Sequence, residues 1–291
     1  MALSTETLKT GGRGTGFRGT RKAAARGTAP AAGNGNRKRN RILLGATGVA
    51  GLGLTMEAVS RAGLVHSDFL PPFSTVLGEA VLIWGREDFR ADVLSTIGSY
   101  LLGMGLSALI AIPLGVLFGL SERVYRASRA VVELIRPIPP VALIPLVVLV
   151  FGNGLEMKLV IVVFAAVWPI LFNTMYGVHD VDKQGKEMAR SFGVSPAGVI
   201  RRVVLPGAAP FIATGIRVSS SIALIVVITV ELIAGGAEGI GAFIARTRAT
   251  GTEVELVYAG TLMAGVLGLS LNMILNSAER RWFGWQSTKG A

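Results

Sequence analysis

The sequence holds few residues that could do covalent chemistry, and they lie far apart. It has no cysteine and two histidines, His66 and His179, in separate parts of the chain. The lack of cysteine excludes disulfides, thiolate metal sites and cysteine nucleophiles. A phosphate-binding loop is also missing, because "DKQGKEM" lacks the first glycine and the final Ser or Thr of the G-x-x-x-x-G-K-[ST] pattern. We therefore expect no metal, no cofactor and no enzymatic activity, and any ATP must be bound by a partner.

One charged segment is distinctive in its residue types and spacing. "EMARSFGVSPAGVIRRVVLPGAAP", from Glu187 to Pro210, carries a glutamate and three arginines between two strongly apolar stretches. "KEMARSF" is predicted to form a short helix that ends at Gly193, where a left-handed or closely packed residue is needed. A second helix then starts with Ser195 as N-cap and Pro196 at the first helical position. We expect an elbow that can insert into a groove on a soluble partner.

The rest of the chain must position this elbow, and its composition indicates a membrane protein. Hydrophobic residues make up 51% of the chain and the mean hydropathy is +0.57. Apolar runs near the ~20 residues that cross a bilayer predict an all-α polytopic protein with six spans, at 42–59, 93–120, 138–151, 159–178, 212–234 and 257–275. The third span starts in "RPIPPVALIP", whose prolines remove helix donors, so we expect it to be kinked or partly non-helical.

The distribution of basic residues predicts the orientation. The segments up to residue 41, 121–137, 179–211 and from 276 hold 22 of the 29 lysines and arginines. Cytoplasmic segments carry the positive excess, so both termini and the loop 179–211 are expected in the cytoplasm, with the chain in the cytoplasmic membrane.

The first 41 residues are predicted to be a disordered basic tail, with the transmembrane domain at 42–291. The tail is rich in Gly, Ala and Arg and has no apolar periodicity. This composition indicates attraction to anionic lipid rather than RNA binding, because Phe17 is the one aromatic residue of the tail that could serve as a stacking platform. We expect lipid, and no nucleic acid, as its partner.

The elbow resembles a known motif. Glu187, Met188, Ala189, then Gly193, Val203 and Leu205-Pro206 follow the spacing of the EAA motif, E-A-A-x3-G-x9-I-x-L-P, in the membrane subunits of ABC importers, with Met188 for Ala and Val203 for Ile. From Phe69 onward, "FLPPFSTVLGEAV", "RPIPPVALIPLVVLVFGNG", "WPILFNTMYGVHDVD", "ELIAGGAEGIG" and "LNMILNSAERRWFGW" are similar to the permeases for nitrate, taurine and aliphatic sulfonates.

This resemblance implies a type I importer permease that moves a small anionic solute by alternating access. It also implies a second copy of the chain, ATP-binding cassette ATPase subunits that hydrolyse ATP, and an extracytoplasmic solute-binding protein. The EAA residues would contact the ATPase subunits. The resemblance does not identify the solute.

Two other interpretations compete with this one. The segment could be an amphipathic loop on the headgroups, with Arg190, Arg201 and Arg202 on lipid phosphates, but that does not explain the spacing of Glu187 and Gly193. The chain could also be a gradient-driven transporter or channel, yet such proteins often pair broken helices across inverted repeats, and we find one Pro-broken span. An enzyme embedded in the membrane ranks last, because it would need a cluster of reactive groups in or near the spans and we find none in the sequence.

A few polar residues lie within or near the predicted spans. Arg217 and Glu231 are charged residues of the fifth span, and we expect Arg217 to snorkel and Glu231 to lie at the outer interface. Asn173 and Thr229 complete a candidate translocation path with these two. Outside the spans, Ser74 is predicted to cap an interfacial helix, and "GGAEGIGAFIARTRATG" to form a short outer gate helix.

Overall fold

The computed structural model describes residues 34–66, 68–135, 137–236 and 238–283. Within these ranges all regular structure is helical, which confirms the all-α prediction. Five helices are long and apolar enough to cross a membrane: α1 (Asn34–Arg61), α3 (Glu87–Gly119), α6 (Leu155–Asp180), α9 (Leu205–Ala234) and α11 (Val254–Phe283). A bent helix pair provides a sixth candidate span, as the sequence predicted.

The bent pair occupies the position of the predicted third span. Helix α4 (Glu122–Ile135) is followed by the short 3-10 helix η2 (Pro140–Leu143) and by α5 (Ile144–Phe151), and the two parts are bent by 70°. The prolines at this break have no backbone N–H and therefore cannot donate the hydrogen bonds that would continue a helix. The predicted kink is confirmed, but most of 121–137, which the sequence analysis treated as a loop, is helix α4.

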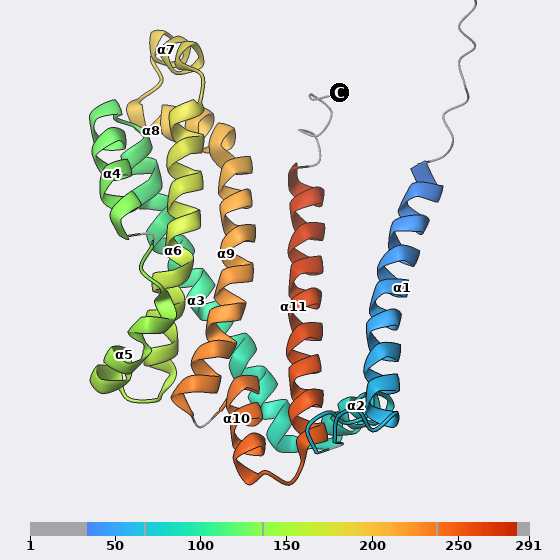
Figure 1. Ribbon diagram of the computed structural model, residues 1–291. Coiled ribbons are helices and arrows are strands. Elements are labelled where there is room, and N and C mark those ends of the chain that lie inside the picture. The colour runs from blue at the N-terminus through green and yellow to red at the C-terminus, as the bar shows by residue number, and fades with distance from the viewer. Residues whose placement is uncertain (1–33, 67, 136, 237, 284–291) are drawn as a thin grey trace, which may run out of the picture. The chain divides into compact units, whose positions relative to one another are not determined.

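The core lies where α3, α6 and α9 pack together (Figure 1). Glycines allow these helices to approach closely: a Cβ at Gly115 would lie 2.6 Å from the Thr174 side chain, and one at Gly215 would lie 3.0 Å from the Asn173 side chain. Close helix approach through small residues is the main way that membrane helices associate without a hydrophobic driving force. These three helices therefore form the packed core of the molecule.

The chain divides into two compact units, residues 1–51 and 52–291. Helix α1 begins at Asn34, so residues 34–41, which we had assigned to the disordered tail, are helical. The remainder of the predicted tail, residues 1–33, lies outside the described residues.

Helix α2 (Phe73–Leu82), continued by the 3-10 helix η1 (Ile83–Gly85), begins differently from the prediction. Its N-cap is Pro72, and the backbone and hydroxyl of Ser74 both donate 2.9 Å hydrogen bonds to the carboxylate of Glu57. The predicted cap was wrong because a distant carboxylate can satisfy the first helical donors, and sequence spacing does not reveal it. The side chains that α2 and η1 bury are Val76, Ala80 and Ile83.

Candidate functional site

The elbow is formed as predicted, by two helices with a left-handed residue between them. The N-cap of helix α7 (Lys183–Ser191) is Asp182, whose side chain accepts a 3.0 Å hydrogen bond from Gln184 N. Gly193 has φ +76°, and the amides of Gly193 and Val194 donate to Arg190 O and Ala189 O at 2.9 and 3.1 Å. These two bonds close a Schellman motif. No atom lies within 4 Å of a Cβ built on Gly193, so backbone conformation, not close packing, requires the glycine.

The second arm of the elbow continues directly into a span. Helix α8 (Pro196–Val199) has Ser195 as N-cap, with Oγ accepting from Gly198 N at 3.2 Å, and Pro196 in its first turn. It runs through a π-helical turn, η3 (Ile200–Val204), into α9, so residues 196–234 form one helical run. The fifth span was predicted to start at 212, but the helical run that contains it begins at Pro196, and the π-helical turn just before Pro206 accommodates a residue that has no backbone N–H to donate. The second arm of the elbow and this span are therefore one continuous helical element.

The motif residues divide into an exposed and a packed group. Glu187 and Met188 are exposed on α7, and Phe192 beside them is 79% exposed. Ala189 and Val203 instead pack against a small apolar cluster that includes Val178, Val199, Val204 and Ala208. Leu205 is half-buried and Pro206 is exposed. The elbow thus has a packed inner side and an outer side that presents Glu187 with two large apolar side chains.

A lysine attaches the elbow to the end of α6. Lys186 Nζ donates a 3.2 Å hydrogen bond to Val178 O. Burial lowers the pKa of this ammonium group, and the neighbouring charges of Lys183 and Arg190 lower it further. The first arm is consequently connected to α6, while the second arm is continuous with α9.

A cavity of about 430 Å³ lies beside α6 and α9. Asn173 lines it, together with Glu133, Trp168, Tyr176 and Val218, among others. Asn173 Nδ2 donates to Pro169 O at 2.8 Å, and Trp168 Nε1 is a buried donor that no described residue accepts from. The cavity combines an apolar wall with a few polar groups, which is the usual composition of a site for a small molecule.

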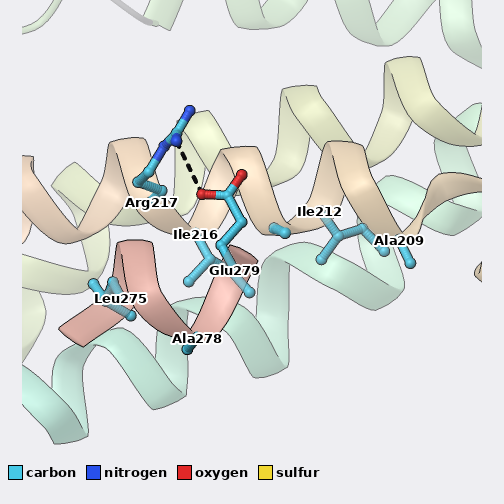
Figure 2. Close-up of a pocket in the computed structure, with 8 residues that line it drawn as sticks. Ala209, Ile212, Ile216, Arg217, Leu275, Ala278 and Glu279 are labelled. Atoms are coloured by element: carbon cyan, nitrogen blue, oxygen red, sulfur yellow. Dashed lines mark ion pairs between the residues drawn. The ribbon is translucent and has the colours of Figure 1, made fainter. Parts of the chain in front are cut away.

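Arg217 lies in a different place from Asn173. It forms a 2.9 Å ion pair with Glu279 of α11, and the two line a second cavity of about 230 Å³ with apolar neighbours (Figure 2). Arg217 was expected to snorkel to the interface, and the structure shows in addition that it pairs with Glu279 of another helix. Thr229 donates to Ile225 O of its own helix at 2.7 Å. The predicted path residues thus do not form one site.

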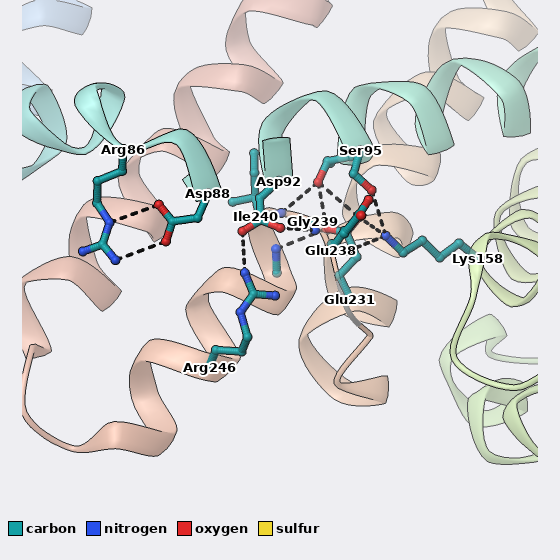
Figure 3. Close-up of polar contacts among 12 residues, drawn as sticks. Arg86, Asp88, Asp92, Ser95, Lys158, Glu231, Glu238, Gly239, Ile240 and Arg246 are labelled. Atoms are coloured by element: carbon teal, nitrogen blue, oxygen red, sulfur yellow. Dashed lines mark hydrogen bonds and ion pairs between the residues drawn. The ribbon is translucent and has the colours of Figure 1, made fainter. Parts of the chain in front are cut away.

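Glu231 is buried inside the protein near the end of α9, and its position at the outer membrane interface stays a prediction. Its side chain is 0% exposed and forms a 2.9 Å ion pair with Lys158 of α6. Thr96 of α3 donates to the same carboxylate at 2.9 Å. Next to this group, Asp92 forms a 2.5 Å ion pair with Arg246 of helix α10 (Ile240–Thr250), as Figure 3 shows. Helix α10 confirms that a short helix follows the fifth span.

Sequence reasoning missed four members of this network. Asp92 and Lys158 each lie one residue outside a predicted span, where charged residues are ordinary, and Thr96 and Arg246 carried no signal of their own. Lys158 and Glu231 are 73 residues apart in the chain. A buried charge needs a partner, so the intramembrane position of Glu231 was the one available indication that a cation should lie near it.

The chain is similar to known transport proteins. The family of binding-protein-dependent transport system inner membrane components matches residues 111–284. The chain is similar to the taurine transport system permease protein of Escherichia coli, with 31% identity covering 78% of this chain and 84% of that protein. It is also similar to the nitrate import permease protein of Leptolyngbya laminosa, with 28% identity covering 62% of this chain and 63% of that protein.

The fold also matches solved structures. A chain of the MetNI methionine ABC transporter, in an inward-facing conformation, aligns with a TM-score of 0.56 and 20% identity, covering 69% of this chain and 97% of that chain. At this identity the likeness shows a shared fold, that of the type I ABC importer permeases.

Proposed function

Because the chain belongs to the family of binding-protein-dependent transport system inner membrane components, we propose that it carries a small anionic solute across the bacterial cytoplasmic membrane under the power of separate ATPase subunits. It is the membrane-spanning permease subunit of an ABC importer. The sequence holds no phosphate-binding loop of its own, so ATP hydrolysis falls to ATP-binding cassette partners.

The elbow is the observation that carries this proposal. Its outer side presents the carboxylate of Glu187 together with Met188 and Phe192, which are 64% and 79% exposed. Exposed large apolar side chains beside a charge are typical of a helix that inserts into a groove on a partner. Its second arm is continuous with α9, so a displacement of the elbow would move a span of the core directly.

The same contacts assign roles to the motif residues. Glu187 and Met188 would meet the ATPase subunit. Ala189, Val203 and Leu205 would hold the elbow against α6 and α9, Gly193 would set its angle, and Pro206 would lie at the start of the span. This division follows their exposure.

The remaining partners follow from the mode of transport. An extracytoplasmic binding protein would deliver the solute, and a second copy of this chain would complete the path and supply a second elbow. We propose that α7 and α8 face the cytoplasm with both termini, as the basic residues indicate. The end of the molecule that carries α2 and α10 would then lie on the outer side.

The solute class is proposed from the relatives, among them permeases named for taurine and nitrate. Of the four predicted path residues, Asn173 is the one we retain as a candidate solute contact, because it lines the 430 Å³ cavity beside the buried indole N–H of Trp168. Arg217, Thr229 and Glu231 bond within the protein, and we assign them structural roles.

Charge changes on the elbow test the coupling proposal. Glu187→Lys reverses the charge on the outer side and should abolish co-purification of the ATPase subunit or separate ATP hydrolysis from uptake. Arg201→Gln is the matched control on the second arm, and it should leave both measurements close to wild type because an exposed headgroup contact contributes only about 1 kcal/mol. Membrane abundance of the variants is compared by immunoblot.

The opposite pattern would refute the coupling role. If Glu187→Lys kept both ATPase binding and uptake while Arg201→Gln lost them, the elbow would be a lipid-lying amphipathic segment.

A further inference from the structure

The solute-transport function does not by itself explain the buried charges around Glu231. We propose that Asp92, Thr96, Lys158 and Glu231 form a latch that holds helix α10 in place, and that α10 must leave this latch for the solute path to open at that end of the molecule. This inference rests on the proposed function, in which α10 lies on the outer side of a solute path.

One half of the latch belongs to the packed core. Thr96 lies on α3, Lys158 on α6 and Glu231 on α9, the three helices that pack most closely with one another. Lys158 Nζ donates to Glu231 Oε1 at 2.9 Å, and Thr96 Oγ1 donates to Oε2 at 2.9 Å. All three residues are at most 4% exposed. These contacts persist wherever α10 lies, because none of them involves it.

The other half belongs to α10 and the turn before it. The amides of Gly239, Ile240 and Gly241 donate to Asp92 Oδ1, Thr96 Oγ1 and Glu231 Oε2 at 2.7, 2.9 and 3.1 Å. Lys158 Nζ also donates to Glu238 O at 2.6 Å. The amides at the start of a helix are otherwise unsatisfied and carry partial positive charge, so the two carboxylates are well placed to hold them (Figure 3).

Two glycines make this close approach possible. Gly239 has φ +124°, and a Cβ there would overlap the carboxylate of Glu231. A Cβ on Gly241 would lie 2.7 Å from Glu231 Cβ and 2.8 Å from Leu232 N. The "GIG" sequence therefore lets the backbone of α10 come directly against the buried carboxylate, which an ordinary helix start would not do.

The polar nature of the latch suits an attachment that must be released. A buried ion pair adds little net stability compared with apolar packing, but it specifies one arrangement. If α10 moved away, Asp92 would lose both Gly239 N and Arg246, whereas Glu231 would keep Lys158 and Thr96. Water that enters an open path can solvate the Asp92 carboxylate and the freed amides. The closed and open positions of α10 can therefore both satisfy these groups.

Helix α10 keeps an apolar attachment on its other contacts. Phe243 packs edge-on against Phe89 at 5.1 Å between ring centroids, and Ile244 lies in the same cluster with Leu256 of α11. Loss of the latch should thus loosen the start of α10 without unfolding it. This difference makes the proposal testable with side-chain variants.

The test uses a single reporter cysteine, since the natural chain has none. Ala242→Cys places the thiol on α10 at a residue that is 0% exposed. The transporter, assembled with its ATPase subunits in lipid nanodiscs without nucleotide, is treated with a water-soluble maleimide, and the labelling rate is measured. Adding Arg246→Gln, which removes the charge that pairs with Asp92, should raise the rate at least about tenfold by shifting α10 toward its released position. Arg246→Lys, which keeps the charge, should restore slow labelling.

Asp88→Asn is the control in the same region. Asp88 pairs with Arg86 at 3.1 Å with both side chains about half exposed, and its loss should leave the labelling rate unchanged. Melting temperature and size-exclusion elution confirm that each variant is folded. Lys158→Met is a second variant that should also increase labelling, and Arg246→Gln decides the matter if Lys158→Met does not assemble.

The proposal would be overturned if the Arg246→Gln protein and the protein with the intact latch, both folded and assembled, were labelled at equal rates. It would also be overturned if Asp88→Asn accelerated labelling as much as Arg246→Gln does. ATP-driven uptake by the same preparations is measured separately. If labelling rises but no variant or parent shows ATP-driven uptake, the transport function fails while the attachment of α10 by the latch stands. If uptake is ATP-driven and labelling does not respond, the latch alone is wrong.

Discussion

Gly193 is the residue whose conformation determines the shape of the elbow. Its φ of +76° is open to glycine at no steric cost, and a side chain there meets no neighbour. Gly193→Val should therefore destabilise the elbow by roughly 1–3 kcal/mol through backbone strain alone. Limited proteolysis of the assembled protein should show faster cleavage near residue 193 and weaker retention of the ATPase subunit.

Gly185 provides the matched control for this change. It lies inside α7, has ordinary helical φ, and a Cβ there would make normal contacts at 3.9 Å. Gly185→Ala should strengthen α7 by about 1 kcal/mol through helix propensity and leave cleavage unchanged or slower. Equal sensitivity of the two variants would show that the left-handed turn has no special role.

Single residues also show where sequence reasoning succeeds. The Ser195 cap, the Pro196 start and the left-handed Gly193 were all predicted, because each depends on neighbours a few residues away. The partners of Glu231 and Arg217 were not, because Lys158 and Glu279 are distant in the chain and only packing brings them near. Local backbone chemistry can be derived from one sequence, whereas long-range ion pairs cannot.

At the scale of elements, the important feature is the continuity of α8, η3 and α9. The sequence predicted a loop to 211 and then a span, because two prolines and two arginines interrupt the apolar pattern. The structure instead has one helical run over 196–234, since Pro206 lies in the first turn of α9 and neighbouring packing accommodates Pro210. The elbow is thus a lever whose long arm is a core helix.

A flexible insertion tests the lever. Two glycines inserted after Val199 should interrupt this helical run while leaving α7 and its exposed side chains intact, because glycine disfavours helix by about 1 kcal/mol per residue. The ATPase subunit should still co-purify, but uptake per ATP hydrolysed should fall at least about tenfold.

The same insertion between α1 and α2, after Gly63, is the control and should leave the ratio unchanged. A lever role would be excluded if both insertions kept normal uptake per ATP. Loss of ATPase binding only after the Val199 insertion would instead assign the second arm to docking.

At the scale of the whole molecule, the spans and the fold were predictable and their interruptions were not. Hydropathy gave six spans because each needs ~20 apolar residues, and the described structure has five helices that qualify plus one bent pair. Helix α4 was missed because it is amphipathic and charged, so it resembles a cytoplasmic loop in composition. The position of α10 on the core depends on glycines and carboxylates from separate segments, which composition does not reveal.

The central claim is that this permease is driven by ATP hydrolysis in a partner, and reconstitution tests it directly. The chain is incorporated into proteoliposomes with and without its ATPase subunits, solute-binding protein is supplied on the side of α10, and uptake of radiolabelled taurine and nitrate is measured. Uptake of at least one solute should require the ATPase subunits, the binding protein and hydrolysable ATP, and should be insensitive to sodium and proton ionophores. Uptake by the chain alone, driven by a sodium or proton gradient and indifferent to ATP, would contradict the account and favour a secondary transporter.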